Sequence, residues 1–117
     1  MIKGIGIDMV ELLRIEKIIE NKSSFVQRVL TDDEYALFKE LSHKRQVEFL
    51  AGRFACKEAF SKAWGTGIGN VGLRDVEILK EESGAPKVTK SPHEGNVFVS
   101  ISHTDTFAVA QIILEVD

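Results

Sequence analysis

The sequence has a single cysteine, Cys56, among its 117 residues, so no disulfide can form within the chain. Such a chain is typical of a reducing compartment. No run of apolar residues approaches the length of a membrane span, and the N-terminal segment MIKGIGID is too short and too interrupted by glycine for a signal peptide. We therefore expect a cytoplasmic protein with no membrane partner.

An excess of basic residues is also absent. The formal net charge of −3 at pH 7 argues against a protein that binds nucleic acid through a broad basic field, although it permits local basic patches. No internal repeat, low-complexity segment or linker divides the chain, and its apolar fraction of 44% is ordinary for a globular protein. The sequence therefore predicts one domain over residues 1–117, with a modest core that oligomerisation could supplement.

The N-terminal segment IKGIGID alternates in the manner of a β-strand. One face of this strand carries Ile5 and Ile7, and the other face carries Gly4, Gly6 and Asp8. Because the two glycines have no side chain, another element can pack closely beside the Asp8 carboxylate.

The remaining patterns predict an α+β fold. Four helices follow the first strand, and the third opens at Thr31 with the Thr-x-x-Glu spacing of a capping box. Alternating segments near the C-terminus indicate strands, and the last two form a predicted hairpin. We expect an antiparallel sheet with a long central helix packed across it. The expected helices span 10–20, 25–30, 31–41 and 49–64, a polar link spans 42–45, and the expected strands span 2–8, 76–82, 97–103 and 107–116.

The helix over 49–64 carries the densest polar chemistry in the sequence. One side is a stripe of small residues that would let another backbone approach closely. The stripe consists of Gly52, Ala55, Cys56, Ala59 and Ala63. The other side carries Arg53, Lys57, Glu58, Ser61 and Lys62, with Leu50, Phe54 and Trp64 among them. A plain solvated face would hold only polar residues, so we expect a ligand, another segment or another subunit to cover the charged side.

Asp8 and Glu58 are candidate metal ligands, because Mg²⁺ in proteins takes one or two carboxylates together with water and substrate phosphate. For Asp8 the alternative is a helix N-cap, since Asp8-x-x-Glu11 has the spacing of a capping box. For Glu58 the alternative is a surface ion pair with Lys62 at i, i+4, worth only ~0.3–0.5 kcal/mol. The neighbouring aromatic residues weaken that second alternative, because a charge beside them is poorly placed in bulk water.

Three further features have a structural alternative to a functional role. The glycine-rich exit that starts at Gly65 follows a helix and lacks the lysine and hydroxyl of a P-loop, so a helix stop is favoured over a phosphate loop. His103 closes a strand, where a lone histidine is usually structural or exposed, and a role in a functional site is the alternative. Lys44, Arg45 and Arg53 could bind a phosphate or could be ordinary basic residues near a helix start. The sequence contains no Ser-His-Asp triad and no zinc-ligand spacing.

Three segments, in order, carry a resemblance to a known family: GIGIDMVEL, FLAGRFACKEAFSKAWGTGIG and VSISHTDTFAVAQIILE. The combination of G-x-D, F-x-x-K-E-x-x-x-K and S-x-S-H-T over essentially the whole chain is specific, although each motif alone is common. The chain resembles the holo-acyl-carrier-protein synthases, which are small 4′-phosphopantetheinyl transferases. The resemblance implies the fold of that family. It also implies transfer of 4′-phosphopantetheine from coenzyme A to a serine of apo acyl carrier protein in fatty acid biosynthesis, with release of adenosine 3′,5′-bisphosphate.

The resemblance also implies roles for individual residues. Asp8 and Glu58 correspond to the family's Mg²⁺ ligands and Lys62 to a lysine that binds the pyrophosphate, which makes these three the candidate catalytic residues. From the chemistry of the attack, Glu58 is in addition the hypothesised acceptor of the serine proton, either directly or through a metal-bound water. Ala85 stands where the family often has lysine, so a lysine contact is expected to be absent there. The other expected coenzyme A contacts are Ser61, Gly65, Gly84, Pro86, His103 and Thr104, with Lys44, Arg45 and Arg53 as candidates for the 3′-phosphate.

The carrier protein implied by the resemblance is acidic, and the net-acidic chain has a local group of basic residues that could dock it. This group lies in and just after the first predicted helix and consists of Arg14, Lys17, Lys22 and Arg28. An ordinary mixed surface is the alternative, because the same helix carries Glu11, Glu16 and Glu20.

The resemblance further implies a homotrimer with active sites at subunit boundaries. Three predicted surfaces are consistent with such contacts: the bare face of Gly4 and Gly6, the aromatic residues on the charged side of the central helix, and a small face of the hairpin. On that hairpin Ser100 and Ser102 share a face, which we expect to be matched by the alanines at 108 and 110.

Two other classes of function are compatible with the residues. One is a non-catalytic module that docks a protein through its charged helix. The other is a different Mg²⁺-dependent enzyme that uses Asp8 and Glu58 on a nucleotide or phosphoester.

Overall fold

The computed structural model describes residues 1–65 and 71–117, so Gly67 and Gly69 of the glycine-rich exit lie outside the described residues. Among the helices of the described residues, none is both long and apolar enough to cross a membrane. The elements, in chain order, are β1 (Ile2–Glu11), α1 (Leu12–Asn21), α2 (Ser23–Val29), α3 (Asp32–Lys39), α4 (His43–Trp64), a 3₁₀ turn (Leu73–Asp75), β2 (Glu77–Lys80), β3 (Pro86–Lys90), β4 (Asn96–His103) and β5 (Phe107–Glu115).

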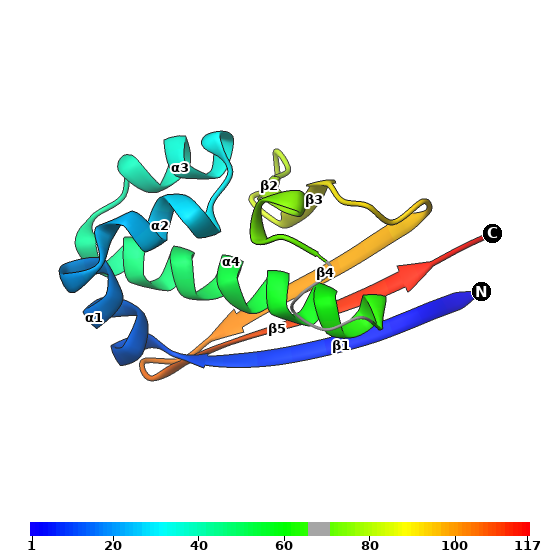
Figure 1. Cartoon of the computed structure of the whole chain (residues 1–117), viewed down its shortest axis with the longest axis horizontal. Helices are drawn as coiled ribbons and strands as arrows, with labels where there is room; N and C mark the ends of the chain where they lie inside the picture. Colours follow the sequence, from blue (N-terminus) through cyan, green and yellow to red (C-terminus); the bar gives the residue numbers. More distant parts are fainter. Residues whose placement is uncertain (66–70) are drawn as a thin grey trace.

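Three long strands form an antiparallel sheet in the order β1-β5-β4, and α4 lies across one face of it (Figure 1). The short helices α1, α2 and α3 gather around the first turns of α4. Strands β2 and β3 form a separate two-stranded sheet on the same side of the long sheet as α4. The predicted α+β fold, with an antiparallel sheet and a long helix packed across it, is confirmed.

The two glycines of β1 allow α4 to lie directly against the strand. A Cβ atom at Gly4 would collide with the carbonyl oxygen of Ala63, and one at Gly6 would collide with that of Ala59. Both alanines are buried against the sheet as part of the predicted stripe of small residues. The bare glycine face is therefore covered by a helix of the same chain, and the expectation that another subunit covers it is wrong.

Strand β1 is longer than the alternation predicts, because its pairing with β5 continues to Glu11 opposite Phe107. Helix α1 then begins at Leu12 with Glu11 as its N-cap residue. Asp8 consequently lies inside the strand, opposite Ala110, and the alternative interpretation of Asp8 as an N-cap is wrong.

Helix α4 begins earlier than predicted. The Ser42 side chain accepts a hydrogen bond from the backbone N–H of Arg45 and caps the helix, so the predicted polar link over 42–45 is the cap and first turn of α4. The capping box at the start of α3 is confirmed, with Thr31 N–H donating to the Glu34 carboxylate at 2.8 Å and Glu34 N–H donating to the Thr31 hydroxyl at 3.2 Å.

The strands after α4 differ from the prediction in two respects. Strand β3 was missed, because the turn residues on both sides of the segment led us to expect an irregular passage. The predicted hairpin of β4 and β5 is present, but Ser100 pairs with Gln111 and Ser102 pairs with Val109, on the face away from α4. Ala108 and Ala110 are buried on the opposite face, so the predicted matched small surface is wrong.

Part of the charged side of α4 is covered by other segments of the chain. Lys57 is fully buried and its ammonium group donates to the Glu34 carboxylate and to the carbonyl oxygen of Val29, both at 2.6 Å. Burial lowers the pKa of Lys57, and the charge of Glu34 opposes that change. Glu34 also accepts from Ile78 N–H at 2.8 Å, so this ion pair joins α2, α3, α4 and β2. Another segment, rather than a ligand or a subunit, is the cover here.

The aromatic residues of α4 also have partners within the chain. Phe54 packs against Phe25 with ring centroids 5.9 Å apart, and Trp64 stacks on Phe60 at 5.8 Å. These side chains therefore do not need a subunit contact to explain them.

Replacing Gly6 with alanine tests the contact between β1 and α4. We expect a loss of roughly 2 kcal/mol or more in the free energy of unfolding, because the carbonyl of Ala59 cannot move without shifting the helix. Gly52→Ala is the matched control and should lose little or no stability. Its Cβ would meet only the Ile101 side chain, at 3.2 Å, and alanine is more favourable than glycine in a helix interior by up to ~1 kcal/mol. Urea unfolding followed by circular dichroism measures both, and a Gly6→Ala variant as stable as wild type would contradict the account.

Candidate functional site

Asp8 and Lys62 meet at the contact between β1 and α4. The Lys62 ammonium donates to Asp8 Oδ1 at 3.0 Å and to the carbonyl oxygen of Ile7 at 3.1 Å. The Asp8 side chain is 19% exposed and that of Lys62 is 56% exposed, so the carboxylate is held in a partly buried position beside a more exposed cation. This side of β1 also carries Gly4 and Gly6, and it is the side where the sequence predicts close packing beside Asp8.

Glu58 lies one helical turn before Lys62 and is half-buried. Burial raises the pKa of Glu58, the charge of Asp8 raises it further, and Lys62 and Arg14 act in the opposite direction. Asp8 and Glu58 therefore share one electrostatic environment. Among the ion pairs of the described residues, Lys62 pairs with Asp8 and not with Glu58, so the simple surface pair along α4 is not formed.

The residues present fit a hard divalent cation. Asp8 and Glu58 offer oxygen ligands of the kind that Mg²⁺ prefers, and of the two only Asp8 has an ion-pair partner among the described residues, while Lys62 and Arg14 act on Glu58 from a distance. The ammonium of Lys62 stands at Asp8 Oδ1, which shows that the position already favours positive charge.

A cavity of about 150 Å³ lies between the first half of α4, the turn that joins β2 to β3, and the end of β4. Gly84 in that turn has φ of +90°, a conformation that favours glycine. Five residues predicted to contact coenzyme A line the cavity together: Arg45, Arg53, Gly84, Pro86 and His103.

Arg53 is held firmly in the cavity wall. Its guanidinium donates to the carbonyl oxygen of Ile78 at 3.2 Å and lies 4.1 Å from the centroid of the Phe49 ring. Burial lowers the pKa of Arg53, and nearby Glu34 opposes that change. Arg53 is almost fully buried and its Nη2 also donates to the carbonyl oxygen of Leu79 at 3.5 Å, so its contacts here are structural and a contact with a 3′-phosphate stays a prediction.

Two charged residues of the cavity lining, Glu48 and Lys80, were not predicted to contact the ligand. Glu48 lies between Arg45, whose Nε is 3.4 Å from its carboxylate, and His103, whose Nδ1 is 4.0 Å from it. The i, i+3 spacing of Arg45 and Glu48 could have indicated the first contact. Lys80 of β2 also lines the cavity and pairs with Pro86. It brings a lysine to the turn that has Ala85, and only the pairing of β2 with β3 reveals it.

Ser61 and Gly65, two of the predicted phosphate contacts, are engaged within α4. The Ser61 side chain is buried and its hydroxyl donates to the carbonyl oxygen of Lys57 at 3.2 Å. Gly65 has φ of +86° and its N–H donates to the carbonyl oxygens of Ser61 and Lys62, so it is the helix stop that the sequence predicts. A contact of either residue with phosphate stays a prediction.

Lys44 and Thr104 lie outside the cavity lining. Lys44 instead lines a neighbouring cavity with Glu48 and Asp105. The Thr104 hydroxyl accepts hydrogen bonds from the N–H groups of Thr106 and Phe107, at 3.2 and 3.1 Å, and so closes the hairpin turn. Their roles in binding coenzyme A stay predictions.

Three of the four predicted docking residues, Arg14, Lys17 and Lys22, line one groove of about 510 Å³ along α1. Arg28 lies on α2 outside that lining. Neither Asp8 nor Glu58 lines the groove, but the charge of Arg14 acts on Glu58 from the groove wall. Of the three glutamates that suggested an ordinary mixed surface, only Glu11 lines the groove.

Comparisons with known proteins agree with this arrangement. A family model described as "4'-phosphopantetheinyl transferase superfamily" matches residues 4–112. A holo-[acyl-carrier-protein] synthase of Enterococcus faecalis is 70% identical over 115 residues, which cover 98% of each chain. One of Streptococcus thermophilus is 56% identical, covering 98% of this chain and 97% of that protein. A crystal structure of the Bacillus anthracis holo-(acyl-carrier-protein) synthase in complex with CoA (3',5'-ADP) is 48% identical, with a TM-score of 0.93 over 100% of this chain and 99% of that one.

The titration of Glu58 tests the electrostatics of the site. We expect Asp8→Asn to lower the pKa of Glu58 and Lys62→Ala to raise it, because these changes remove a negative and a positive neighbour respectively. Carboxyl ¹³C chemical shifts followed against pH measure both changes. Lys39→Ala, which removes an exposed lysine that does not act on Glu58, is the control and should leave this pKa where it is. If Asp8→Asn leaves the pKa of Glu58 unchanged, the two carboxylates are not neighbours.

Proposed function

The chain belongs to the 4′-phosphopantetheinyl transferase superfamily and is a transferase of the holo-[acyl-carrier-protein] synthase family, and from that membership and its site we propose a specific reaction. It moves 4′-phosphopantetheine from coenzyme A onto a serine of apo acyl carrier protein, depends on Mg²⁺ and releases adenosine 3′,5′-bisphosphate. We place this step in cytoplasmic fatty acid biosynthesis, with residues 1–117 as one catalytic domain.

The observation that carries the proposal is the group of Asp8, Glu58 and Lys62. In the reaction, the serine oxygen forms a bond to the β-phosphorus of coenzyme A. The bond from that phosphorus to the bridging oxygen breaks, and the bisphosphate leaves with the electron pair. Asp8 and Glu58 would hold Mg²⁺, which when bound supplies Lewis-acid stabilisation of the phosphate oxygens. Lys62 neutralises charge that builds on the leaving phosphate.

The serine proton needs an acceptor, and we assign it to Glu58. Burial and the charge of Asp8 raise the pKa of this carboxyl in the metal-free protein, and a bound cation would lower it, so Glu58 accepts the proton either directly or through a water. Arg14 and Lys62 act on the same carboxylate in the direction opposite to burial and Asp8.

The cavity beside α4 is the proposed place for the adenosine end of coenzyme A. Arg45, Arg53 and Lys80 supply positive charge for the 3′-phosphate, with His103 beside them. Arg45 is paired with Glu48 in the free protein, and the 3′-phosphate would replace Glu48 as the partner of this arginine when coenzyme A binds.

Mass spectrometry of apo acyl carrier protein after incubation with the enzyme, coenzyme A and Mg²⁺ tests the function. We expect a phosphopantetheinyl mass gain that disappears when EDTA removes the metal. A non-catalytic docking module would give no gain. An enzyme that acts on another phosphoester would leave the carrier unmodified, and either result would overturn the proposal.

Lys62→Ala is expected to slow transfer by about 10²-fold or more, because removal of one preorganised electrostatic group from a transition state costs that much. Initial rates at saturating coenzyme A measure the effect, and Lys39→Ala, at an exposed lysine of α3, serves as the matched control. If Lys62→Ala retains full activity, Lys62 is only an ion-pair partner of Asp8.

The groove along α1 is the proposed docking surface for the acidic carrier. Arg14 and Lys17 line it beside the exposed Leu13, and Arg14 links it to Glu58. A surface of this composition combines long-range attraction with one apolar anchor.

The double variant Arg14→Glu/Lys17→Glu should raise the KM for carrier protein by roughly tenfold or more and leave the Kd for coenzyme A unchanged, because rim charges act on association with the charged partner. Lys39→Glu/Lys87→Glu makes the same change in net charge at exposed positions outside the groove and is the control. Equal loss of affinity for both substrates would count against docking in this groove.

We propose that the outer face of the long sheet joins three copies of the chain. Ile5, Ile7 and Met9 of β1 and Phe98 of β4 lie on this face and are 59%, 57%, 63% and 51% exposed. Ile5, Ile113 and Phe98 are aligned across β1, β5 and β4. Apolar side chains aligned in this way are typical of an interface.

Ile7→Lys should convert the trimer into monomers in sedimentation equilibrium, because it places a charge in the contact. Leu37→Lys, at an exposed leucine of α3, should leave the trimer intact. A wild-type protein that is active as a monomer would contradict the proposed assembly.

A further inference from the structure

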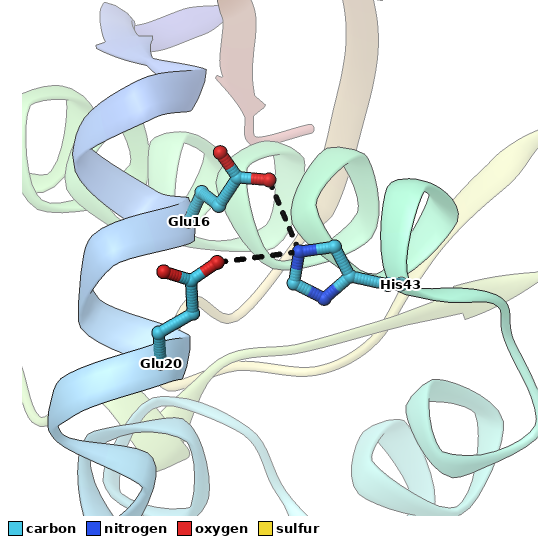
Figure 2. Close-up of side chains that lie close together, drawn as sticks. All are labelled: Glu16, Glu20 and His43. Atoms are coloured by element: carbon cyan, nitrogen blue, oxygen red, sulfur yellow. Dashed lines mark hydrogen bonds and ion pairs between the residues drawn. The ribbon is translucent and has the colours of Figure 1, made fainter.

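Glu16, Glu20 and His43 come together where α1 meets the first turn of α4 (Figure 2). His43 Nε2 lies 3.0 Å from a carboxylate oxygen of Glu16 and 3.7 Å from one of Glu20, and the three ligand atoms all lie within 4.8 Å of one another. The proposed transfer reaction uses none of these residues. Among the described residues, this is the one group of three such side chains that could hold a metal ion.

The charges of this cluster favour a bound cation. Glu16 and Glu20 are four residues apart on one helix face, where like charges repel. Glu20 lies in the last turn of α1, which has no basic residue, and a helix C-terminus disfavours negative charge. A neutral imidazole offers one N–H and cannot satisfy both carboxylates. The partial positive charge at the start of α4 opposes a cation, but two full carboxylate charges outweigh it.

We propose that Glu16, Glu20 and His43 bind a divalent transition-metal ion such as Zn²⁺. One imidazole nitrogen and two carboxylates are three of the four ligands of an open tetrahedral site, with water as the fourth. Bonds of ~2.0–2.1 Å place tetrahedral ligand atoms about 3.3 Å apart, and the separations of 3.0 and 3.7 Å lie on either side of that value. A cavity of about 250 Å³, lined by Glu16 and His43, gives water access to the fourth position.

The ligand chemistry separates this site from the pair formed by Asp8 and Glu58. Imidazole is a good ligand for zinc, copper, nickel and cobalt, whereas Mg²⁺ prefers oxygen ligands alone. The two sites are therefore distinguishable by the metal that each one selects.

A metal here ties α1 to α4. Helix α1 carries Arg14 and Lys17 of the proposed docking groove, and α4 carries Glu58 and Lys62. The ion would add a polar crosslink at the exposed edge of the apolar contact between these helices and hold the groove in a fixed position relative to the carboxylates.

Calorimetric titration of the full chain with Zn²⁺ tests the proposal, and visible absorbance of bound Co²⁺ reports the geometry. We expect one saturable site, a rise in Tm, and at least tenfold weaker binding in both His43→Ala and Glu20→Gln. His93→Ala is the matched control, because His93 lies at the other end of α4 beside Trp64, and it should bind the metal as wild type does. Circular dichroism establishes that each variant is folded.

Asp8→Asn assigns the binding to one of the two sites. It should leave Zn²⁺ affinity unchanged if the ion binds at Glu16, Glu20 and His43. Loss of Zn²⁺ binding in Asp8→Asn with full binding in His43→Ala would overturn the proposal, as would the absence of any saturable binding at millimolar Zn²⁺.

Discussion

The direct contact between β1 and α4 is the constraint on which the site depends. Gly4 lies against Ala63 and Gly6 against Ala59, so a step of two residues along the strand matches four along the helix. These steps are of similar length, about 6.6 Å in a strand and about 6 Å in a helix. The same step brings Asp8, the next residue on that strand face, to the level of Ala55, about one turn before Glu58, and the long Lys62 side chain reaches back to the Asp8 carboxylate. Without glycine at both positions the helix would stand away from the carboxylate.

The buried ion pair on the other side of α4 fixes the rotation of the helix about its axis. Lys57 points into the contact with Glu34, and Glu58, which follows it, is turned by about 100° toward β1. Removing one partner of such a pair leaves an uncompensated buried charge, which typically costs ~3–5 kcal/mol. The pair is therefore a positioning device for Glu58 as well as a link between four elements. The half-buried place that results raises the pKa of Glu58.

Local patterns predicted much of the fold, and contacts between distant residues account for what they missed. Alternation identified the bare face of β1, and spacing identified the capping box at Thr31. The partners of Lys57 lie 23 and 28 residues away, so a wheel projection of α4 placed a buried lysine on a charged face. The site was predicted by resemblance more than by spacing, because nothing local relates Asp8 to Glu58. The place of Lys80 in the cavity wall was not predicted, because it depends on the pairing of β2 with β3.

The central claim is that Asp8 and Glu58 act as one unit on one metal ion, and a double-mutant cycle tests it most directly. The Mg²⁺-dependent transfer rate is measured for wild type, Asp8→Asn, Glu58→Gln and the double variant. The account predicts strong coupling: each single change lowers the rate by about 10²-fold or more, and the double variant is hardly slower than the worse single one. Losses that multiply, with Mg²⁺ dependence retained in both single variants, would contradict the claim.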